Sequence, residues 1–304
     1  MRVFITGATG FLGYHIARTC LAKGHDVVCL HRPASVNPFS GTENSRITWV
    51  TEDEARDRLG FLQPEVLIHA AWGGVSAQGR NDATVQQANI DLTQRIMKLY
   101  PYRQIIMLGS QDEYGRIDRE IDEQQPACPL SEYAKAKVAC CNMLEEYATA
   151  IKAEWQWIRI FSIYGEGQQS CWLIPSVIDK CLSGESVMET TPGEQIYSYL
   201  YCNDFAEAIA ACIGQTGKSG IYNLSSSHPI ALKDLFSLIK KLTKASISFR
   251  ATLPYRENQS MVILGNCHKF VNAFGTFEHT SLEEGLANVI REHRQAITRQ
   301  NNNI

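Results

Sequence analysis

The first half of the chain alternates short apolar runs, rich in β-branched residues, with longer segments of helical periodicity. This alternation predicts parallel strands joined by helices that cover both faces of one sheet, the pattern of an α/β protein with a doubly wound sheet. The expected strands lie at residues 3–5, 27–30, 47–50, 66–71, 105–108 and 158–161, and the expected helices at 11–22, 83–99 and 132–150.

The rhythm changes after residue 162. The segments expected there are a loop at 165–169, a helix at 173–182, a β-rich stretch at 196–201 and a helix with Asn203 as its N-cap. A chain of 304 residues has room for two units when a domain takes about 150 residues. We therefore expect a larger domain at 1–162 and a smaller α/β domain at 163–304, with some later segments returning to the first sheet.

Charge and cysteine content limit the partners and the compartment. The formal net charge is −3 and the pI about 6.3, without a cluster of Lys and Arg, which argues against a nucleic acid partner. The ten cysteines form no CxxC pair and are expected to be reduced and buried. Because the apolar stretch at the N-terminus is too short for a signal peptide, we expect a cytoplasmic protein. We expect no membrane insertion, since no apolar run approaches about 18 residues.

A glycine-rich turn directly follows the first expected strand and opens the first expected helix. Its glycines allow a tight turn whose backbone N–H groups face a pyrophosphate at the positive end of the helix. The spacing of three and three differs from the GxGxxG of the commonest dinucleotide fingerprint, so a turn without a ligand is the alternative. The candidate cofactor-binding residues here are Gly7, Thr9, Gly10, Phe11, Leu12 and Gly13.

The end of the second expected strand indicates which dinucleotide is bound. An NAD site usually carries an acidic residue there to hold the ribose 2′-hydroxyl, whereas this chain has His31 followed by Arg32. A cation at this position suits a 2′-phosphate. The sequence therefore favours NADP(H) over NAD(H), and the alternative is that Arg32 is only a solvated surface residue.

Tyr133 and Lys137 are four residues apart near the start of an expected helix, so the phenol and the ammonium share one helix face. A nearby cation stabilises a phenolate, which predicts that the pKa of Tyr133 falls from about 10 towards the working pH. Tyr133 can then exchange a proton with a substrate oxygen. Ser110 follows the strand at 105–108 and can hydrogen-bond the same oxygen from the carboxyl edge of the sheet. An isolated Tyr and Lys pair of this spacing is usually chance, but the glycine turn argues against that reading.

Several motifs together resemble the extended short-chain dehydrogenase/reductases. They are Gly7 to Gly13, His69-Ala-Ala, Leu108-Gly-Ser110-Gln-Asp-Glu-Tyr114-Gly, Tyr133-xxx-Lys137, Ile160-Phe-Ser-Ile-Tyr164-Gly and Tyr199-Leu-Tyr-Cys-Asn-Asp204. The resemblance covers nearly the whole chain. It implies a Rossmann dinucleotide-binding domain, a C-terminal substrate-binding domain, and action on a nucleoside-diphosphate sugar as an epimerase, a dehydratase or a 4-keto reductase.

The resemblance also assigns residues to roles. It places Ser110, Tyr133 and Lys137 at the catalytic positions, with Tyr133 and Lys137 also contacting the cofactor, which Ala70 and Ala71 line. The candidate substrate contacts are Trp72, Asn89, Ser110, Asp112, Ser162 and Arg256, although Trp72 could equally well only pack. No His or Cys cluster has the spacing of metal ligands, so we expect no metal. Membership would also suggest a homodimer.

Departures from the family pattern select among its reactions. The dehydratases carry Thr-Asp-Glu at the strand end, where this chain has Ser110-Gln111-Asp112. Because an amide replaces the dehydratase acid, the resemblance argues against dehydration. The arginine that often opens a later Arg-Asp-Tyr segment is replaced by Tyr197, which leaves Arg256 as the candidate diphosphate contact.

These observations lead to one preferred function and two alternatives. We predict NADPH-dependent reduction of a nucleoside-diphosphate 4-keto-6-deoxyhexose to the 4-hydroxy sugar, as in deoxysugar and O-antigen biosynthesis. One alternative is an NAD-dependent 4-epimerase that uses the same Ser, Tyr and Lys. The other is a protein that senses NADP(H) on this fold without turnover, although such relatives often lose the Tyr or the Lys.

Overall fold

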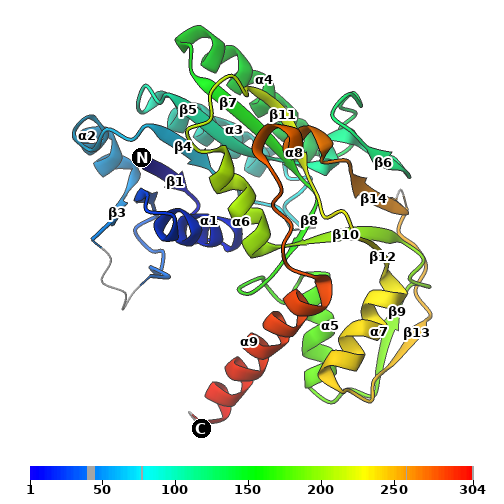
Figure 1. Cartoon of the computed structure of the whole chain (residues 1–304). Coiled ribbons are helices and arrows are strands. Elements are labelled where there is room, and N and C mark those ends of the chain that lie inside the picture. The colour runs from blue at the N-terminus through cyan, green and yellow to red at the C-terminus, as the bar shows by residue number, and fades with distance from the viewer. Residues whose placement is uncertain (40–44, 77, 258, 303–304) are drawn as a thin grey trace.

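The computed structural model of the chain describes residues 1–39, 45–76, 78–257 and 259–302. A seven-stranded parallel sheet forms its centre (Figure 1). The strand order is β11-β7-β5-β4-β1-β2-β3, so the order reverses beside β1. These strands are β1 (Arg2–Thr6), β2 (Asp26–Leu30), β3 (Ile47–Val50), β4 (Val66–His69), β5 (Gln104–Ser110), β7 (Glu154–Ile160) and β11 (Gly220–Leu224). The predicted doubly wound α/β fold is confirmed.

Helices cover both faces of this sheet because successive strand residues point to opposite sides. Val3 and Ile5 of β1 pack with α1 (Phe11–Ala22) and α6 (Cys202–Cys212) on one face. Phe4, between them, packs on the other face with the helices α2, α3 and α4. The bounds of these helices are Glu52–Leu62 for α2, Ala83–Lys98 for α3 and Glu132–Ile151 for α4. Both faces of the large sheet are therefore buried, which explains the nearly continuous apolar runs in the sequence.

A second group of elements carries its own apolar core. The helices α5 (Leu173–Leu182), α7 (Leu232–Thr243) and α9 (Leu282–Asn302) pack together, and α9 extends towards the C-terminus (Figure 1). A five-stranded sheet has the order β12-β10-β14-β6, with β8 also paired to β10, and β13 pairs with β9. The remaining elements are β6 (Glu120–Ile121), η1 (Gln111–Tyr114), β8 (Ser162–Tyr164), β9 (Val187–Thr190), β10 (Ile196–Tyr201), β12 (Pro229–Ala231), β13 (Ser248–Ala251), β14 (Val262–Gly265) and α8 (His268–Phe274).

The boundary expected after residue 162 falls inside β8, just after its first residue, Ser162. β11, at Gly220–Leu224, lies in the large sheet beside β7 although it follows that boundary by many residues. The division into a cofactor domain and a substrate domain stays a prediction.

Several local expectations need correction. β4 ends at His69, so Ala70 and Ala71 lie in the following loop. Tyr201, not Asn203, is the N-cap of α6, and the Asn203 side chain instead meets Arg18 of α1. Cys128 and Cys171 are exposed, contrary to the expectation of burial, and all ten thiols are free.

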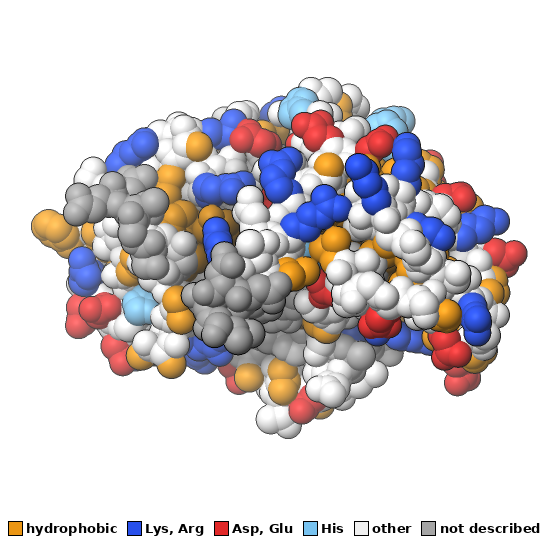
Figure 2. All heavy atoms as spheres, turned by 90° about the horizontal axis from the view of Figure 1, so that it is seen from below, with side chains coloured by type: hydrophobic (Ala, Val, Ile, Leu, Met, Phe, Trp, Pro, Cys, Tyr) orange, Lys and Arg blue, Asp and Glu red, His pale blue; other side chains and the backbone are white. Residues whose placement is uncertain are grey.

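The surface is mixed in charge. Lys and Arg side chains lie among Asp and Glu side chains on the face shown in Figure 2. None of the helices in the described ranges combines the length and apolarity that a membrane-spanning segment needs.

Candidate active site

The glycine turn lies between β1 and α1, where the strand order reverses and α/β proteins bind their ligands. Gly10 is the N-cap of α1 and donates its N–H to Gly7 O at 2.9 Å. Gly7 has a φ of +76°, and a Cβ added to Gly13 would lie 2.1 Å from Gly7 O. A side chain at Gly13 would force the strand and the helix apart. The bare backbone lets N–H groups at the helix start approach a phosphate.

A cavity of about 380 Å³ opens at this turn, and Thr9, Gly10 and Phe11 line it. On the other side of the turn, Gly7 lies so close to the loop after β4 that an added Cβ would be 2.7 Å from Ala71 N. The structure thus brings the glycine turn against Ala70 and Ala71, the two residues predicted to line the cofactor. This arrangement fits the pyrophosphate of a dinucleotide.

His31 and Arg32 lie one strand away from the glycine turn, at the same edge of the sheet. Thr6 of β1 is in register with Leu30 of β2, so Gly7 and His31 both follow directly on strand ends. The His31 ring meets Trp49 edge to face at 5.7 Å between centroids, and Arg32 is exposed. Arg32 is therefore open to a ligand bound along this edge.

Ser110, Tyr133 and Lys137 come together beside the end of β5. The Ser110 hydroxyl lies near enough to the Tyr133 phenol to lower its pKa. Lys137 Nζ donates to Leu108 O at 2.7 Å and lies 3.5 Å from the centre of the Trp72 ring and 5.7 Å from that of Tyr133. All three predicted catalytic side chains are buried, so they form a group at the carboxyl edge of the sheet.

The electrostatics of this group differ from the expectation. Burial raises the pKa of Tyr133 above its usual 10.0, and the nearby Ser110 hydroxyl and the Arg80 charge act in the opposite direction without cancelling this rise. The lowering predicted from Lys137 is therefore wrong for the chain alone. Burial also lowers the pKa of Lys137, to about 7. Lys137 is thus poised to change charge near neutral pH.

A buried ion pair stands behind Ser110 and was not anticipated. Glu113 in η1 accepts hydrogen bonds from Ser110 N at 2.7 Å, from Trp157 Nε1 at 3.0 Å and from Arg159 Nε at 2.7 Å. The side chains of Glu113 and Arg159 are 0% and 5% exposed. The guanidinium also lies 4.3 Å from the centre of the Tyr114 ring. This network fixes the backbone that carries Ser110.

The loop after β4 is held against the site by two buried amides of α3. Asn89 accepts from Gly73 N at 2.8 Å and donates to Gly73 O at 2.9 Å. Gln86 donates to Gly74 O and Gly79 O and accepts from Trp72 Nε1 at 3.0 Å. Both groups of the Asn89 amide are thus engaged by the loop, and a substrate contact for Asn89 stays a prediction. This loop also carries Arg80, which forms an ion pair with Asp112 over the site.

A family model described as the NAD dependent epimerase/dehydratase family matches residues 3–225. The chain belongs to this family. Membership confirms the resemblance seen in the motifs, and with it the prediction of an NAD(P)-dependent enzyme.

Relatives in the family cover nearly the whole chain. A putative UDP-glucose 4-epimerase from Methanocaldococcus jannaschii is 25% identical, over 95% of this chain and 97% of its own length. CDP-abequose synthase from Salmonella muenchen is 23% identical over the same shares. The structure of a UDP-glucose 4-epimerase from Thermotoga maritima, with UDP-glucose, matches with a TM-score of 0.87 and 19% identity, over 98% of this chain and 100% of its own. That likeness shows the fold.

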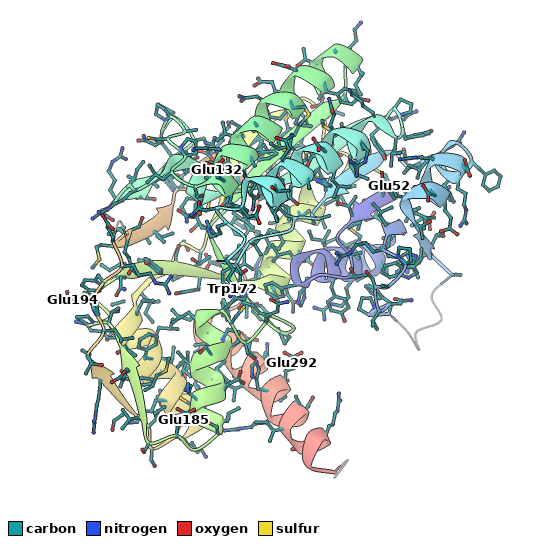
Figure 3. The ribbon with its side chains drawn as sticks, turned by 180° about the vertical axis from the view of Figure 1, so that it is seen from behind. Glu52, Glu132, Trp172, Glu185, Glu194 and Glu292 are labelled. Atoms are coloured by element: carbon teal, nitrogen blue, oxygen red, sulfur yellow. The ribbon has the colours of Figure 1, made fainter. Side chains whose placement is uncertain are left out.

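The remaining candidate substrate contacts of this family member lie in the C-terminal half. Ser162 begins β8 and is in register with Tyr199 of β10. Arg256 is exposed on a loop next to Tyr197, whose hydroxyl accepts from Gln259 Nε2 at 3.3 Å. Trp172 was not among the predicted site residues. Its side chain is 37% exposed, and it is the N-cap of α5, at the end of that helix that points towards the helices of the large sheet (Figure 3).

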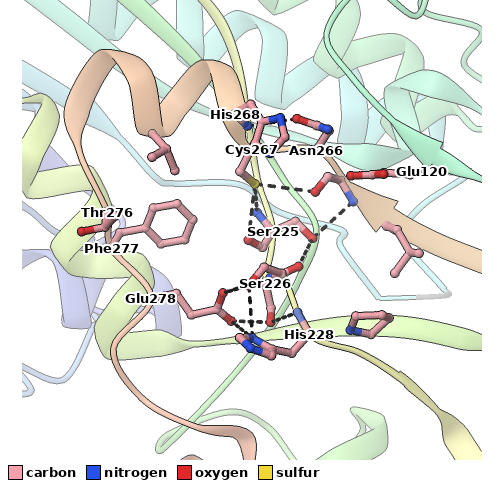
Figure 4. Close-up of a pocket in the computed structure, with 15 residues that line it drawn as sticks. Glu120, Ser225, Ser226, His228, Asn266, Cys267, His268, Thr276, Phe277 and Glu278 are labelled. Atoms are coloured by element: carbon pink, nitrogen blue, oxygen red, sulfur yellow. Dashed lines mark hydrogen bonds and ion pairs between the residues drawn. The ribbon is translucent and has the colours of Figure 1, made fainter.

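A second cavity, of about 420 Å³, contains none of the predicted site residues. It lies between the end of β11, β14 and α8 (Figure 4). Two carboxylates, Glu120 and Glu278, line it, and Glu278 accepts from Ser226 Oγ, from Ser227 N at 2.9 Å and from Ser227 Oγ at 2.7 Å.

Proposed function

We propose that this enzyme uses NADPH to reduce the ketone of a nucleoside-diphosphate 4-keto-6-deoxyhexose to a 4-hydroxy sugar. The observation that carries the proposal is the combination at the end of β5: Ser110 lies with Tyr133 and Lys137, while Gln111 occupies the position of the dehydratase acid. An amide cannot donate the proton that removal of water requires. The chain thus keeps the groups for hydride and proton transfer and lacks one needed for dehydration.

Asp112 supports this choice of reaction. Asp112 directly follows Gln111. It forms an ion pair with Arg80 and accepts a hydrogen bond from the side-chain amide of Gln111. A carboxylate held by a guanidinium is a weak base, because the cation favours its ionised form. We propose that Asp112 shapes the sugar site and does not take up a substrate proton.

Tyr133, Ser110 and Lys137 have different roles in the transfer of the proton. The nicotinamide supplies the hydride when it is bound. Tyr133 gives its phenolic proton to the carbonyl oxygen of the sugar, and Ser110 donates a hydrogen bond to the same oxygen and orients it. Lys137 would hold the nicotinamide ribose, and its ammonium favours the phenolate that remains. Arg256 would contact the diphosphate of the substrate.

The position of Arg32 supports NADPH over NADH, since an exposed guanidinium at the end of β2 can pair with a 2′-phosphate. We expect NADPH to bind at least about tenfold more tightly than NADH, and Arg32→Gln to remove most of this difference. Isothermal titration calorimetry measures both dissociation constants. Arg250→Gln, at an exposed position on β13, is the matched control. Tighter binding of NADH by the unaltered protein would refute the assignment.

The direct test of the reaction is consumption of NADPH. We expect the absorbance of NADPH to fall in proportion to added dTDP- or CDP-linked 4-keto-6-deoxy sugar, with a 4-hydroxy sugar appearing in equal amount by mass spectrometry. No consumption with any such sugar would overturn the proposal.

A 4-epimerase is the second candidate, because the relative from Methanocaldococcus jannaschii and the structure from Thermotoga maritima both carry that name. An epimerase regenerates its cofactor in every cycle and would interconvert UDP-sugars without net change in NADPH. Nicotinamide nucleotide retained through purification, together with such interconversion, would identify this function.

A further inference from the structure

The ring of Tyr133 is covered by a guanidinium that the sequence analysis did not anticipate. Arg80 Cζ lies 4.5 Å from the centre of the ring, and Trp72 meets the same ring edge to face at 6.0 Å. A cation over an aromatic face is attracted by the negative face of the ring, and it also favours negative charge on the phenolic oxygen. Arg80 is therefore placed to interact with both forms of this tyrosine.

Arg80 is held in this place from several sides. Its guanidinium forms the ion pair with Asp112 and donates to Val75 O at 3.2 Å. The backbone carbonyl oxygen of Arg80 accepts a hydrogen bond from Tyr133 N at 2.8 Å. Arg80 thereby satisfies one of the N–H groups that have no partner within the helix at the start of α4. The side chain is 28% exposed. These contacts fix the position of the charge relative to the phenol.

The other charges near Tyr133 come from three elements. Lys137, on the same helix, lies farther from the ring centre than Arg80, at 5.7 Å against 4.5 Å, and its ammonium is already engaged by Leu108 O and the face of Trp72. Glu113 of η1 acts on the phenol in the opposite sense, but Arg159 neutralises it. Asp112, also of η1, faces Arg80. Arg80 is thus the nearer of the two cations.

We propose that Arg80, held by Asp112, is a positioning residue that places a fixed positive charge against the Tyr133 phenol and so favours its ionised form as the proton leaves. The proposal rests on the proposed function only in that Tyr133 transfers the proton. In reduction the O–H bond of Tyr133 breaks, the proton goes to the ketone oxygen, and the electron pair stays on the phenolate beside Arg80. Because arginine stays protonated in proteins, this charge does not vary across the working pH range, unlike that of Lys137.

The first test is the pH profile of reduction. Since Tyr133 must be protonated to act, the rate falls at high pH, and removing the Arg80 charge should raise the pKa of Tyr133 and move this fall upward. We expect Arg80→Met to move the fall in rate at high pH upward by at least about 1 pH unit and to lower kcat about tenfold. Arg80→Lys keeps a charge and should stay within about 0.5 unit of the unaltered enzyme. Arg58→Met, at an exposed position on α2, is the control for loss of an arginine.

The second test does not depend on the substrate. The absorbance titration of the NADP⁺-saturated protein, minus that of its Tyr133→Phe variant, isolates one phenol among twelve tyrosines. The same difference in the Arg80→Met background should titrate at least about 1 unit higher. Coincident curves, including the absence of a transition in both, would overturn the proposal. If the phenol shifts but no keto sugar is reduced, the role of Arg80 stands and the proposed function fails.

Discussion

Replacing Tyr133 by Phe is expected to lower kcat for reduction by a factor of about 10²–10⁴, the usual contribution of a positioned general acid. The phenyl ring can keep the packing against Trp72 and Arg80, since both contacts are made to the ring. Only the hydroxyl, which lies near Ser110, is lost. The affinity for NADPH should therefore change by less than about threefold. Stopped-flow reduction and calorimetry measure the two quantities separately.

Tyr147→Phe is the matched control, because it removes a half-buried hydroxyl from the same helix away from Ser110. It should leave kcat and the affinity for NADPH unchanged. A protein that only senses NADP(H) would be indifferent to both substitutions. Retention of most of the turnover by Tyr133→Phe would remove the proton donor from the mechanism.

Most strands of the large sheet could be predicted from the sequence because their residues are largely buried. Val3 and Ile5 of β1 pack on one face and Phe4 on the other, and β4 and β5 alternate in the same way, which leaves uninterrupted apolar runs in the sequence. In the second sheet only β10, at Ile196–Tyr201, matches a stretch predicted as β-rich, and its shorter strands give no such signal. β6 spans Glu120–Ile121 and pairs with β14, which lies more than a hundred residues later. Pairing of that kind depends on the tertiary fold and not on local periodicity.

The residues of the candidate site could also be predicted only in part. Tyr133 and Lys137 could be found from helical spacing, and Ser110 from its place at a strand end. Arg80 could not, because its approach to Tyr133 is set by the path of the loop that Gln86 and Asn89 fix. Arg159 did leave a signal, since a charged residue interrupts the otherwise apolar end of β7 and must find a partner if that strand is buried.

The partner of Arg159 is Glu113, and replacing Glu113 is the second substitution for which we expect a large effect. Glu113→Gln is expected to lower the free energy of unfolding by about 3–5 kcal/mol, because the substitution leaves the Arg159 guanidinium buried without a counter-charge. The amide oxygen can still accept one of the hydrogen bonds that the carboxylate now receives, but its NH₂ group faces donors. Urea denaturation measures the change. Glu132→Gln removes the exposed pair with Lys135 and should cost no more than about 0.5 kcal/mol.

A second substitution separates a buried unpaired charge from a loss of packing. If the cost in Glu113→Gln comes from Arg159, then Glu113→Gln combined with Arg159→Met should be more stable than Glu113→Gln alone by at least about 1 kcal/mol. Catalysis should not recover with stability, because Ser110 N would still lack its carboxylate partner and the serine would be less well fixed. A double variant that is less stable than either single variant would show that the pair contributes mainly through packing against Trp157 and Tyr114.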